Sequence, residues 1–409
     1  MITKVINSSK KINPFGGLFF VINDLKNKGI AKLIDSHLGK RVKQAKYSYS
    51  DILLNWTYCN LCGAERLEDI EKLRDSLDIK LPSHDALGTV MKSFATKTEI
   101  ITQEKDHQFN IHKPLNNLMV DTALKLGLLT KRKPYTLDYD NTIIEAKKYD
   151  STKTYIHSYG YQPGVSFIDK IPVYIEGRNG NSNASYKLTE TIKRTMDILD
   201  GKGIKIKRFR SDAAASQIKL MRYLDGREIE FFIRYRKSKD MVGLLKYAPL
   251  KWKAMMIGDR KYDVTSIDSS ELERPEHSYR IVVTRYIVGG EYAYRGIITN
   301  NNEMSDPDVI YFYNKRGAIE RNFDDLKNNF NWGRLPFSFL NENTVFMIIS
   351  AIVSIIYQYL ISKFSKKLDF LNHTDRLKNF IYHFITCSAI LKGGQLQMFT
   401  DRDYSPLVE

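Results

Sequence analysis

The middle of the chain constrains the fold most, because strand-type and helix-type patterns alternate along it. Residues 134–145 (PYTLDYDNTIIE) and 170–181 (KIPVYIEGRNGN) have the pattern of β-strands, and residues 186–199 (YKLTETIKRTMDIL) have the spacing of an amphipathic helix. Two more strand-type runs follow at 204–212 (IKIKRFRSD) and 228–236 (EIEFFIRYR). Strands connected through a crossover helix predict an α/β core.

The segments on either side of this core have different patterns. Residues 18–130 carry apolar side chains mainly at three- and four-residue spacing, so we expect helices there. Residues 237–300 hold further strand-type runs, which indicate a β-rich subdomain inserted into the core. Residues 344–391 are apolar enough to form helices that pack against the core.

The charge of the chain favours a polyanionic partner. Lys and Arg number 63 against 47 Asp and Glu, which gives a formal charge of +16 at pH 7. Nucleic acid is the first candidate for such a partner, and an acidic membrane surface is the second. The 3 cysteines are too few for a disulfide framework, so we expect a reducing, cytoplasmic environment.

Two patterns have both a structural and a functional interpretation. Cys59 and Cys62 have a zinc-like spacing, but no second pair completes four ligands, which favours two buried thiols. Residues 345–361 approach the length of a membrane span, yet they include Ser, Tyr and Gln, which favours a core helix. Residues 1–15 lack the continuous apolar run of a signal peptide.

Three acidic residues stand at the edges of predicted elements. Asp140 ends the strand TLDYD, Asp212 ends the strand KIKRFRSD, and Glu320 lies in a helical pattern at 311–327. Carboxylates that converge from separate elements can hold two divalent ions about 4 Å apart for a reaction at a phosphodiester. The spacing of these acids is therefore compatible with phosphoryl transfer.

Each of these acids also has an alternative. Asp212 precedes three alanines and fits a helix N-cap or a turn. Asp138 and Asp140 lie on one face of the same strand, so periodicity does not decide which of them is the ligand. Asp324 lies one turn after Glu320 and competes for the helical role.

The segment 311–327 (YFYNKRGAIERNFDDLK) gathers polar groups if it forms one α-helix. At about 100° per residue, a stripe about 60° wide beside the apolar face holds four of them: Tyr313, Arg316, Glu320 and Lys327. Tyr313 and Lys327 would lie about 21 Å apart along the axis, which suits consecutive phosphates of a DNA strand. Arg316 can clamp a phosphate with two parallel hydrogen bonds, and Lys327 can act as a point charge.

These residues resemble a known signature. YNKRGAIERNFDDLK matches Tyr-(two residues)-Arg-(three)-Glu-(six)-Lys, which is similar to the signature of a branch of DDE transposases of bacterial insertion sequences. That branch is named after insertion sequence four, and its thirteen-eighty subgroup is the most similar. LDYDNT and FRSDAAAS resemble the strands that carry the first and second Asp of the family. The resemblance covers residues 130 to 365.

The resemblance implies a fold, an activity and a set of ligands. It implies an RNase H-like catalytic core interrupted by a β-strand subdomain, with Asp140, Asp212 and Glu320 as metal ligands. Asp140 is preferred to Asp138 because Asp140-Asn141-Thr142 fits the family pattern. Two Mg²⁺ ions, for which Mn²⁺ can substitute, would serve hydrolysis and then strand transfer, and Tyr313, Arg316 and Lys327 would contact the DNA backbone of the transposon end.

The resemblance also orders the chain into domains. The expected units are a helical domain for DNA-end binding or dimerisation (1–130), a first part of the catalytic core (131–236), the β-strand insertion (237–300), a second part of the core (301–365) and a C-terminal helical region (366–409). The partners would be double-stranded DNA and a second copy of the chain, with no membrane, in the bacterial cytoplasm at the nucleoid. The helix expected after Ser83 fits either DNA recognition or plain packing.

Release of the element through DNA hairpins would require a strongly distorted end and a flipped base held by an aromatic ring. Trp252, between two lysines of the insertion, and Trp332, after the signature, are the candidates. Trp252 is the one we assign to DNA binding. Two other functions compete with transposition: an RNase H-like nuclease that never rejoins DNA, and a DNA-binding protein derived from a transposase that is not catalytic.

Overall fold

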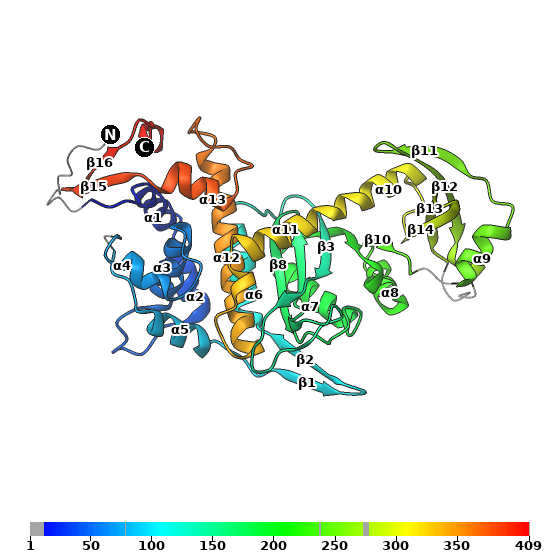
Figure 1. The fold of residues 1–409 in the computed structure, drawn as a ribbon, viewed down its shortest axis with the longest axis horizontal. Helices are drawn as coiled ribbons and strands as arrows, with labels where there is room; N and C mark the ends of the chain where they lie inside the picture. The colour runs from blue at the N-terminus through cyan, green and yellow to red at the C-terminus, as the bar shows by residue number, and fades with distance from the viewer. Residues whose placement is uncertain (1–11, 78, 237–238, 273–277, 409) are drawn as a thin grey trace.

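A large mixed sheet runs through the computed structural model, which describes residues 12–77, 79–236, 239–272 and 278–408 (Figure 1). Within these ranges one sheet has 11 strands. Their spatial order is β1 (Glu99–Thr102), β2 (Asp106–Ile111), β8 (Ile171–Arg178), β7 (Gly164–Ile168), β3 (Tyr135–Asn141), β9 (Ile206–Ser211), β10 (Glu230–Arg234), β14 (Glu291–Thr299), β13 (Arg280–Val288), β12 (Arg260–Asp268) and β11 (Lys253–Ile257). The α/β core predicted from the central patterns is therefore present.

The directions of the central strands decide where their ends meet. β8, β7 and β3 are antiparallel neighbours, whereas β9 runs parallel to β3 and β10 runs parallel to β9. The helix α7 (Leu188–Gly201) connects β8 to β9, and α8 (Ile218–Asp225) connects β9 to β10. The carboxyl ends of β3 and β9 consequently lie side by side at one edge of the sheet.

Helices cover both faces of the central sheet. On β7, Ser166 lies 3.1 Å from Thr195 of α7 between hydroxyl oxygens, while the next residue, Phe167, packs its ring 5.4 Å from that of Phe323. Phe323 belongs to α11 (Ala318–Asn328), which Figure 1 shows crossing the sheet toward α12 (Leu340–Phe364). Because successive strand residues point to opposite faces, α7 and α11 lie on opposite sides of the sheet.

The long apolar helix α12 is the centre of the fold. By length and composition it could cross a membrane, but 94% of its most apolar window is buried inside the molecule. It packs on β8 and on α6 (Lys113–Lys125). This placement agrees with the core helix expected from the sequence.

The N-terminal part contains the expected helices and one feature that we did not expect. Its helices are α1 (Gly17–Asn27), α2 (Ile30–Leu38), α3 (Tyr49–Leu61), α4 (Asp69–Arg74) and α5 (His84–Ser93). The hydroxyl of Ser83 accepts a hydrogen bond from the backbone N–H of Ala86 and so caps α5. Residues 99–111, expected to be helical, instead form β1 and β2; β2 pairs with β8 and β1 pairs with β2, so both strands extend the main sheet.

Cys59 and Cys62 are buried near the end of α3. Burial raises the pKa of Cys59 to about 12 and raises that of Cys62 well above the ordinary range of a thiol. Both thiols are therefore protonated and inaccessible, which agrees with the two buried thiols that the sequence favoured over a zinc site.

The inserted strands were placed correctly along the chain, but they do not form a separate sheet. β11 to β14 pair in a meander, and β14 also pairs with β10 of the core. The insertion, which also contains α9 (Lys239–Tyr247), therefore continues the central sheet outward, as Figure 1 shows on its right-hand side. We call this part the β11–β14 lobe.

The C-terminal region differs from the helices expected there. After α13 (Leu377–Phe380) and a π-helical turn at Ile381–Ile385, the chain forms a hairpin of β15 (Ser388–Lys392) and β16 (Gln395–Phe399). Gly393 and Gly394 join the two strands with positive φ angles of 58° and 79°. A pair of glycines with positive φ is the preferred connection of a two-residue hairpin, so the sequence held a signal for this turn.

His112 makes the start of α6 sensitive to acid. Its Nδ1 accepts the backbone N–H of Leu115, its Nε2 lies 2.7 Å from the carbonyl of Phe94, and burial lowers its pKa. Because the folded pKa lies below the unfolded value, this contribution to stability is present above pH about 6.5 and is lost as the pH falls below it. We expect wild type to lose more unfolding free energy between about pH 7 and pH 5 than His112→Asn, which keeps a capping oxygen without a titrating ring. Urea unfolding at both pH values measures this, and equal losses would contradict it.

Candidate active site

Two predicted acids lie together where β3 and β9 end. Asp140 is the penultimate residue of β3, and Asp212 directly follows β9. The parallel register pairs Tyr139 with Ser211, so the two acids occupy the next position on each strand. They share the face on which α11 lies, because Asp138 and Arg210, two positions earlier, form an ion pair on that face.

Asp212 also caps a short helix. Its Oδ1 accepts a hydrogen bond of 3.0 Å from the backbone N–H of Ala214, at the start of a single 3₁₀ turn, Ala213–Ala215. The N-cap alternative weighed from the sequence is therefore present in the structure. It uses one carboxylate oxygen and leaves Oδ2 as a possible ligand atom.

The environment of Asp140 penalises its charge. Burial, followed by the neighbouring charge of Asp212, raises the pKa of Asp140 to about 6. The Nη1 of Arg316 lies 2.8 Å from its Oδ2 and partly offsets this effect. A perturbed acid beside a second acid and a cation is typical of functional sites.

The segment that carries the signature is not one α-helix. α10 (Asp306–Asn314) is followed by a 3₁₀ turn at Lys315–Gly317, and α11 begins at Ala318. Tyr313 thus lies in the last turn of α10, Arg316 lies in the 3₁₀ turn, and Glu320 and Lys327 lie on α11. Because the turn interrupts the helix, the four polar side chains do not follow the single stripe expected for a continuous helix. Arg316, within the turn, contacts Asp140.

Tyr313 lies between two guanidinium groups. It is buried in a small apolar cluster with Phe232 and Ile310, and only 4% of it is exposed. Arg234 at the end of β10 lies 5.3 Å from the centre of its ring, and Arg316 lies 5.9 Å from it. Arg234, Tyr313, Arg316 and Asp140 therefore form a continuous series of contacts.

Glu320 and Lys327 occupy the exposed side of α11. Glu320 is exposed, and the half-buried Lys327 has its pKa lowered by burial, although Glu145 and Asp324 oppose that shift. Among the residues that the structure describes, no three His, Cys, Asp or Glu side chains are close enough to hold a metal ion. The structure thus brings Asp140, Asp212 and Arg316 together and leaves Glu320 outside this group.

The competing acids have partners of their own. Asp138 accepts hydrogen bonds of 2.7 Å from both Nε and Nη2 of Arg210, and Arg210 also donates to the carbonyl of Phe312. Asp324 forms an ion pair of 3.0 Å with Arg376. A cavity of about 680 Å³ beside α11 is lined by Asp138 and Arg210 but not by Asp140, Asp212 or Glu320.

The two tryptophans differ in exposure. Trp332 is fully buried, and its Nε1 donates to the carbonyl of Met347, which makes it a core residue. Trp252 is partly exposed in the β11–β14 lobe, with the guanidinium of Arg285 4.1 Å from its ring centre. Of the two candidates for holding a base, Trp252 is the accessible one.

Sequence reasoning missed two arginines of this site. Arg210 lies two residues before Asp212, and Arg234 lies at the end of the run EFFIR. The strand period places Arg210 on the face of Asp212, so that neighbour could have been found. Arg234 depends on how α10 packs against β10, which the sequence does not encode locally.

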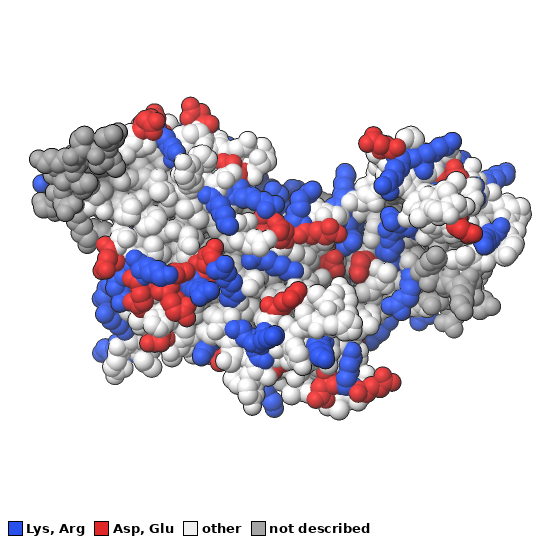
Figure 2. All heavy atoms as spheres, in the orientation of Figure 1, with Lys and Arg blue, Asp and Glu red and all other residues white. Residues whose placement is uncertain are grey.

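Basic side chains surround the site. Figure 2 shows Lys and Arg along the upper edge of the molecule, above a band of Asp and Glu where α11 lies in Figure 1, and again over the β11–β14 lobe. A basic surface beside paired carboxylates suits a polyanionic substrate.

Comparison with known proteins identifies the family of the chain. A search of the curated proteins finds no match. Among solved structures, the chain is similar to a cryo-EM structure of a piggyBac transposase synaptic complex with hairpin DNA, at 11% identity and a TM-score of 0.43, covering 91% of this chain and 79% of that one. The family model described as transposase DDE domain group 1 matches residues 6–372. By that match over most of its length, the chain belongs to the transposase DDE domain group 1 family.

Proposed function

We propose that the protein is a DNA transposase that moves an insertion sequence by cutting its ends and joining them to a new target. The contact of 2.8 Å between Arg316 and Asp140 carries this proposal, because it joins the signature segment to the strand of the first acid. Membership of the family supports the same activity. From the spacing of the signature residues we also propose that the chain belongs to the branch named after insertion sequence four, and to its thirteen-eighty subgroup.

We further propose that the core is RNase H-like. Three antiparallel strands in the order β8, β7, β3 followed by the parallel strands β9 and β10 support this assignment. The order brings Asp140 and Asp212 to one edge, and the β11–β14 lobe is inserted between β10 and the segment that carries Glu320.

The carboxylates of Asp140 and Asp212 fit a divalent cation. Asp140 is partly buried beside a like charge, and a bound cation would relieve the repulsion that helps to raise its pKa. Mg²⁺ is commonly held by one or two carboxylates together with substrate phosphates. We propose that Asp140 and Asp212 hold two Mg²⁺ ions, that Glu320 completes the set, and that Mn²⁺ can substitute. Such ions, when bound, activate the attacking oxygen and stabilise the leaving oxygen.

The other residues would position the DNA. The planar guanidinium of Arg316 can exchange Asp140 for a phosphate and bind it with two hydrogen bonds. Lys327 would contact a phosphate farther along α11, and Tyr313, fixed between Arg234 and Arg316, would hold Arg316 in place and reach a phosphate through its hydroxyl. Trp252 would stack on a displaced base, since it is partly exposed on the β11–β14 lobe.

We also propose that the element leaves its donor through DNA hairpin ends and that two copies of the chain bridge its two ends. Hairpin formation requires the distorted end that Trp252 would stabilise. The reaction would take place in the bacterial cytoplasm, at the nucleoid.

Cleavage of DNA that carries the ends of the element tests the proposal. With Mg²⁺ present, wild type should cut, and Glu320→Gln should bind equally well but cut at least about a hundredfold more slowly, because the amide keeps the shape and loses the charge. Asp324→Asn, which alters the next acid on α11, is the matched control and should cut as wild type does.

The other outcomes separate the competing functions. Equal cleavage by wild type and Glu320→Gln would exclude Glu320 as a ligand. Binding without cleavage by either protein would favour a DNA-binding protein that is not catalytic. Cut ends that are never joined to a target would favour a nuclease.

A further inference from the structure

A small lobe that follows β3 exposes three tyrosines. Residues 144–161, which we call the 144–161 lobe, form a sheet of β4 (Ile144–Glu145), β6 (Tyr159–Tyr161) and β5 (Thr152–Lys153). Tyr149 is 84% exposed, Tyr155 is 74% exposed and Tyr159 is 45% exposed, and Ile156 beside them is 48% exposed. Large apolar side chains left exposed within one short segment indicate a binding surface.

The lobe is anchored to the core. Tyr161 is fully buried and donates its hydroxyl proton to Asp150. Both carboxylate oxygens of Asp150 also accept the backbone N–H of Leu340, at 2.8 and 3.0 Å, at the start of α12. The backbone N–H of Tyr149 donates to Ser338 at 3.0 Å. The exposed rings therefore project from a backbone that is held at several points.

The packing of the lobe leaves no room for adjustment at its centre. A Cβ on Gly160 would lie 2.1 Å from the carbonyl oxygen of Ile144, so β6 can approach β4 only because that position is glycine. The ring of Tyr149 also packs 5.2 Å from that of Phe339. A preorganised surface of this kind binds without a large cost of ordering its side chains.

The charge of the lobe is complementary to nucleic acid. Lys147 and Lys153 are exposed and Lys148 is partly exposed. The lobe has two acids. Asp150 accepts hydrogen bonds from Tyr161 and Leu340, and the charge of Glu145 raises the pKa of Lys327 on α11. Exposed tyrosines together with exposed lysines are the usual composition of a surface that stacks bases and follows a phosphate backbone.

The position of the lobe ties it to the candidate active site. The side chain of Asn141, next to Asp140, donates to the carbonyl of Gln162, and the backbone N–H of Thr142 donates to Pro163. The backbone carbonyl of Tyr159 accepts a hydrogen bond from the backbone N–H of Ala146. Ala146 follows Asp140 by six residues, so at most about 20 Å of extended chain separates Ala146 from Asp140. At about 3.4 Å per base, this is about six bases of DNA.

We propose that the 144–161 lobe binds unpaired bases of DNA beside the cleavage site, by stacking them on Tyr149 and Tyr155. The inference rests on the proposed function, since it assumes that DNA occupies the edge formed by Asp140 and Asp212. Unpaired bases are the ligand because an exposed ring can stack only on a base whose face is free, whereas a paired duplex presents phosphates and groove edges.

Binding of two DNAs to the full chain tests this inference. Both carry the end of the element, one fully paired and one with several unpaired nucleotides on one strand beside the cleavage site, and a chelator prevents cleavage. The double variant Tyr149→Ala/Tyr155→Ala should lose about a hundredfold in affinity for the DNA with unpaired bases and at most about threefold for the paired DNA. Tyr149→Phe/Tyr155→Phe should bind as wild type does, because it keeps both rings.

The control is Tyr382→Ala, which removes a similarly exposed ring, 68% exposed, near the C-terminal hairpin. It should change neither affinity. Equal losses on both DNAs, or no loss, would overturn the inference, and so would a change in sedimentation of the double variant with unchanged DNA affinity, which would indicate a protein interface. The proposed function is tested separately by cleavage with Mg²⁺. If wild type cuts DNA and the double variant binds both DNAs normally, the inference about the 144–161 lobe is rejected and the proposed function stands.

Discussion

Asp140→Asn is expected to lower the rate of cleavage at the element ends by at least about a thousandfold, because an amide does not hold a divalent ion as a carboxylate does. Its unfolding free energy should equal that of wild type or exceed it. Asp140 is partly buried and repelled by Asp212, and Asn removes that repulsion while keeping the size of the side chain. Single-turnover cleavage and urea unfolding without divalent ions measure the two effects.

Asp138→Asn is the matched control on the same face of β3. The side chains of Asp138 and Arg210 are each 8% exposed, so the substitution leaves a guanidinium buried without its counterion. We expect a loss of about 3 kcal/mol in unfolding free energy, and far less effect on cleavage at temperatures where the variant is folded. Loss of cleavage at full stability in Asp138→Asn, with activity kept in Asp140→Asn, would instead make Asp138 the first ligand.

The contrast between these two acids shows what the sequence can predict. Periodicity put Asp138 and Asp140 on one face, but it could not tell the residue paired with Arg210 from the residue at the end of the strand. That distinction depends on β9, whose register places Arg210 beside Asp138. The positions of the core strands and of α7 could be predicted because each of them buries apolar residues at its own period.

Features set by tertiary packing could not be predicted in this way. The 3₁₀ turn at Lys315–Gly317 interrupts a sequence with good helical periodicity, and it is stabilised by the contact of Arg316 with a residue far away in sequence. β1 and β2 are short; β2 forms a strand because the edge of β8 offers unpaired backbone groups, and β1 pairs in turn with β2. The sequence of the 144–161 lobe has hardly any regular apolar pattern. The lobe is held instead by the buried Tyr161 and its hydrogen bond to Asp150.

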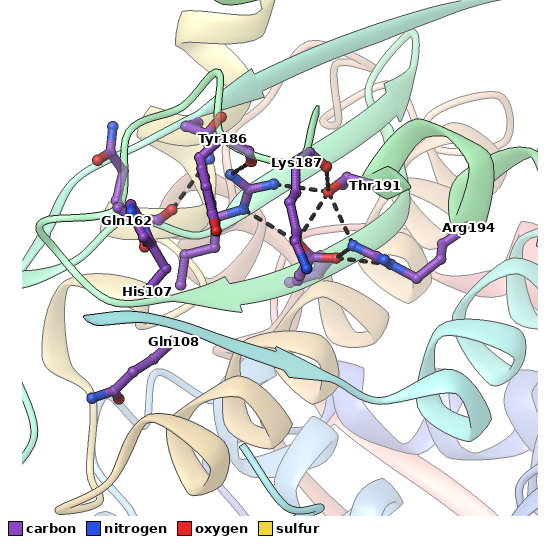
Figure 3. Close-up of polar contacts among 12 residues, drawn as sticks. His107, Gln108, Gln162, Tyr186, Lys187, Thr191 and Arg194 are labelled. Carbon is purple, nitrogen blue, oxygen red and sulfur yellow. Dashed lines mark hydrogen bonds and ion pairs between the residues drawn. The ribbon is translucent and has the colours of Figure 1, made fainter. Parts of the chain in front are cut away.

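Glu176→Gln is expected to destabilise the fold by about 3 to 5 kcal/mol, more than any other single charge removal argued for this chain. Glu176 and Arg178 on β8 are both fully buried, with the Nε of Arg178 3.1 Å from the carboxylate. Arg194 of α7 lies 2.5 Å from the same carboxylate, and Thr191 donates to it at 3.1 Å. Figure 3 shows Thr191 and Arg194 side by side in this network, which connects α7 to the sheet on the face opposite α11.

The size of this effect follows from the charges that glutamine would leave behind. Burial raises the pKa of Glu176, but Arg178 and Arg194 lower it by more, so the folded pKa lies below the ordinary value of 4.5. The stabilisation is therefore complete above that pH and is lost as the pH falls through the folded pKa. At pH 7 the neutral amide would leave Arg178 buried without a counterion.

Urea unfolding at pH 7 measures this loss, with Glu190→Gln on the same helix α7 as the control. Glu190 pairs with Lys219 at the surface, where such a pair contributes about 0 to 1 kcal/mol. Equal unfolding free energies for the two variants would mean that Arg178 finds another partner or reaches water. Since α7 connects β8 to β9, a large loss in Glu176→Gln should also reduce cleavage, whereas Glu190→Gln should cut as wild type does.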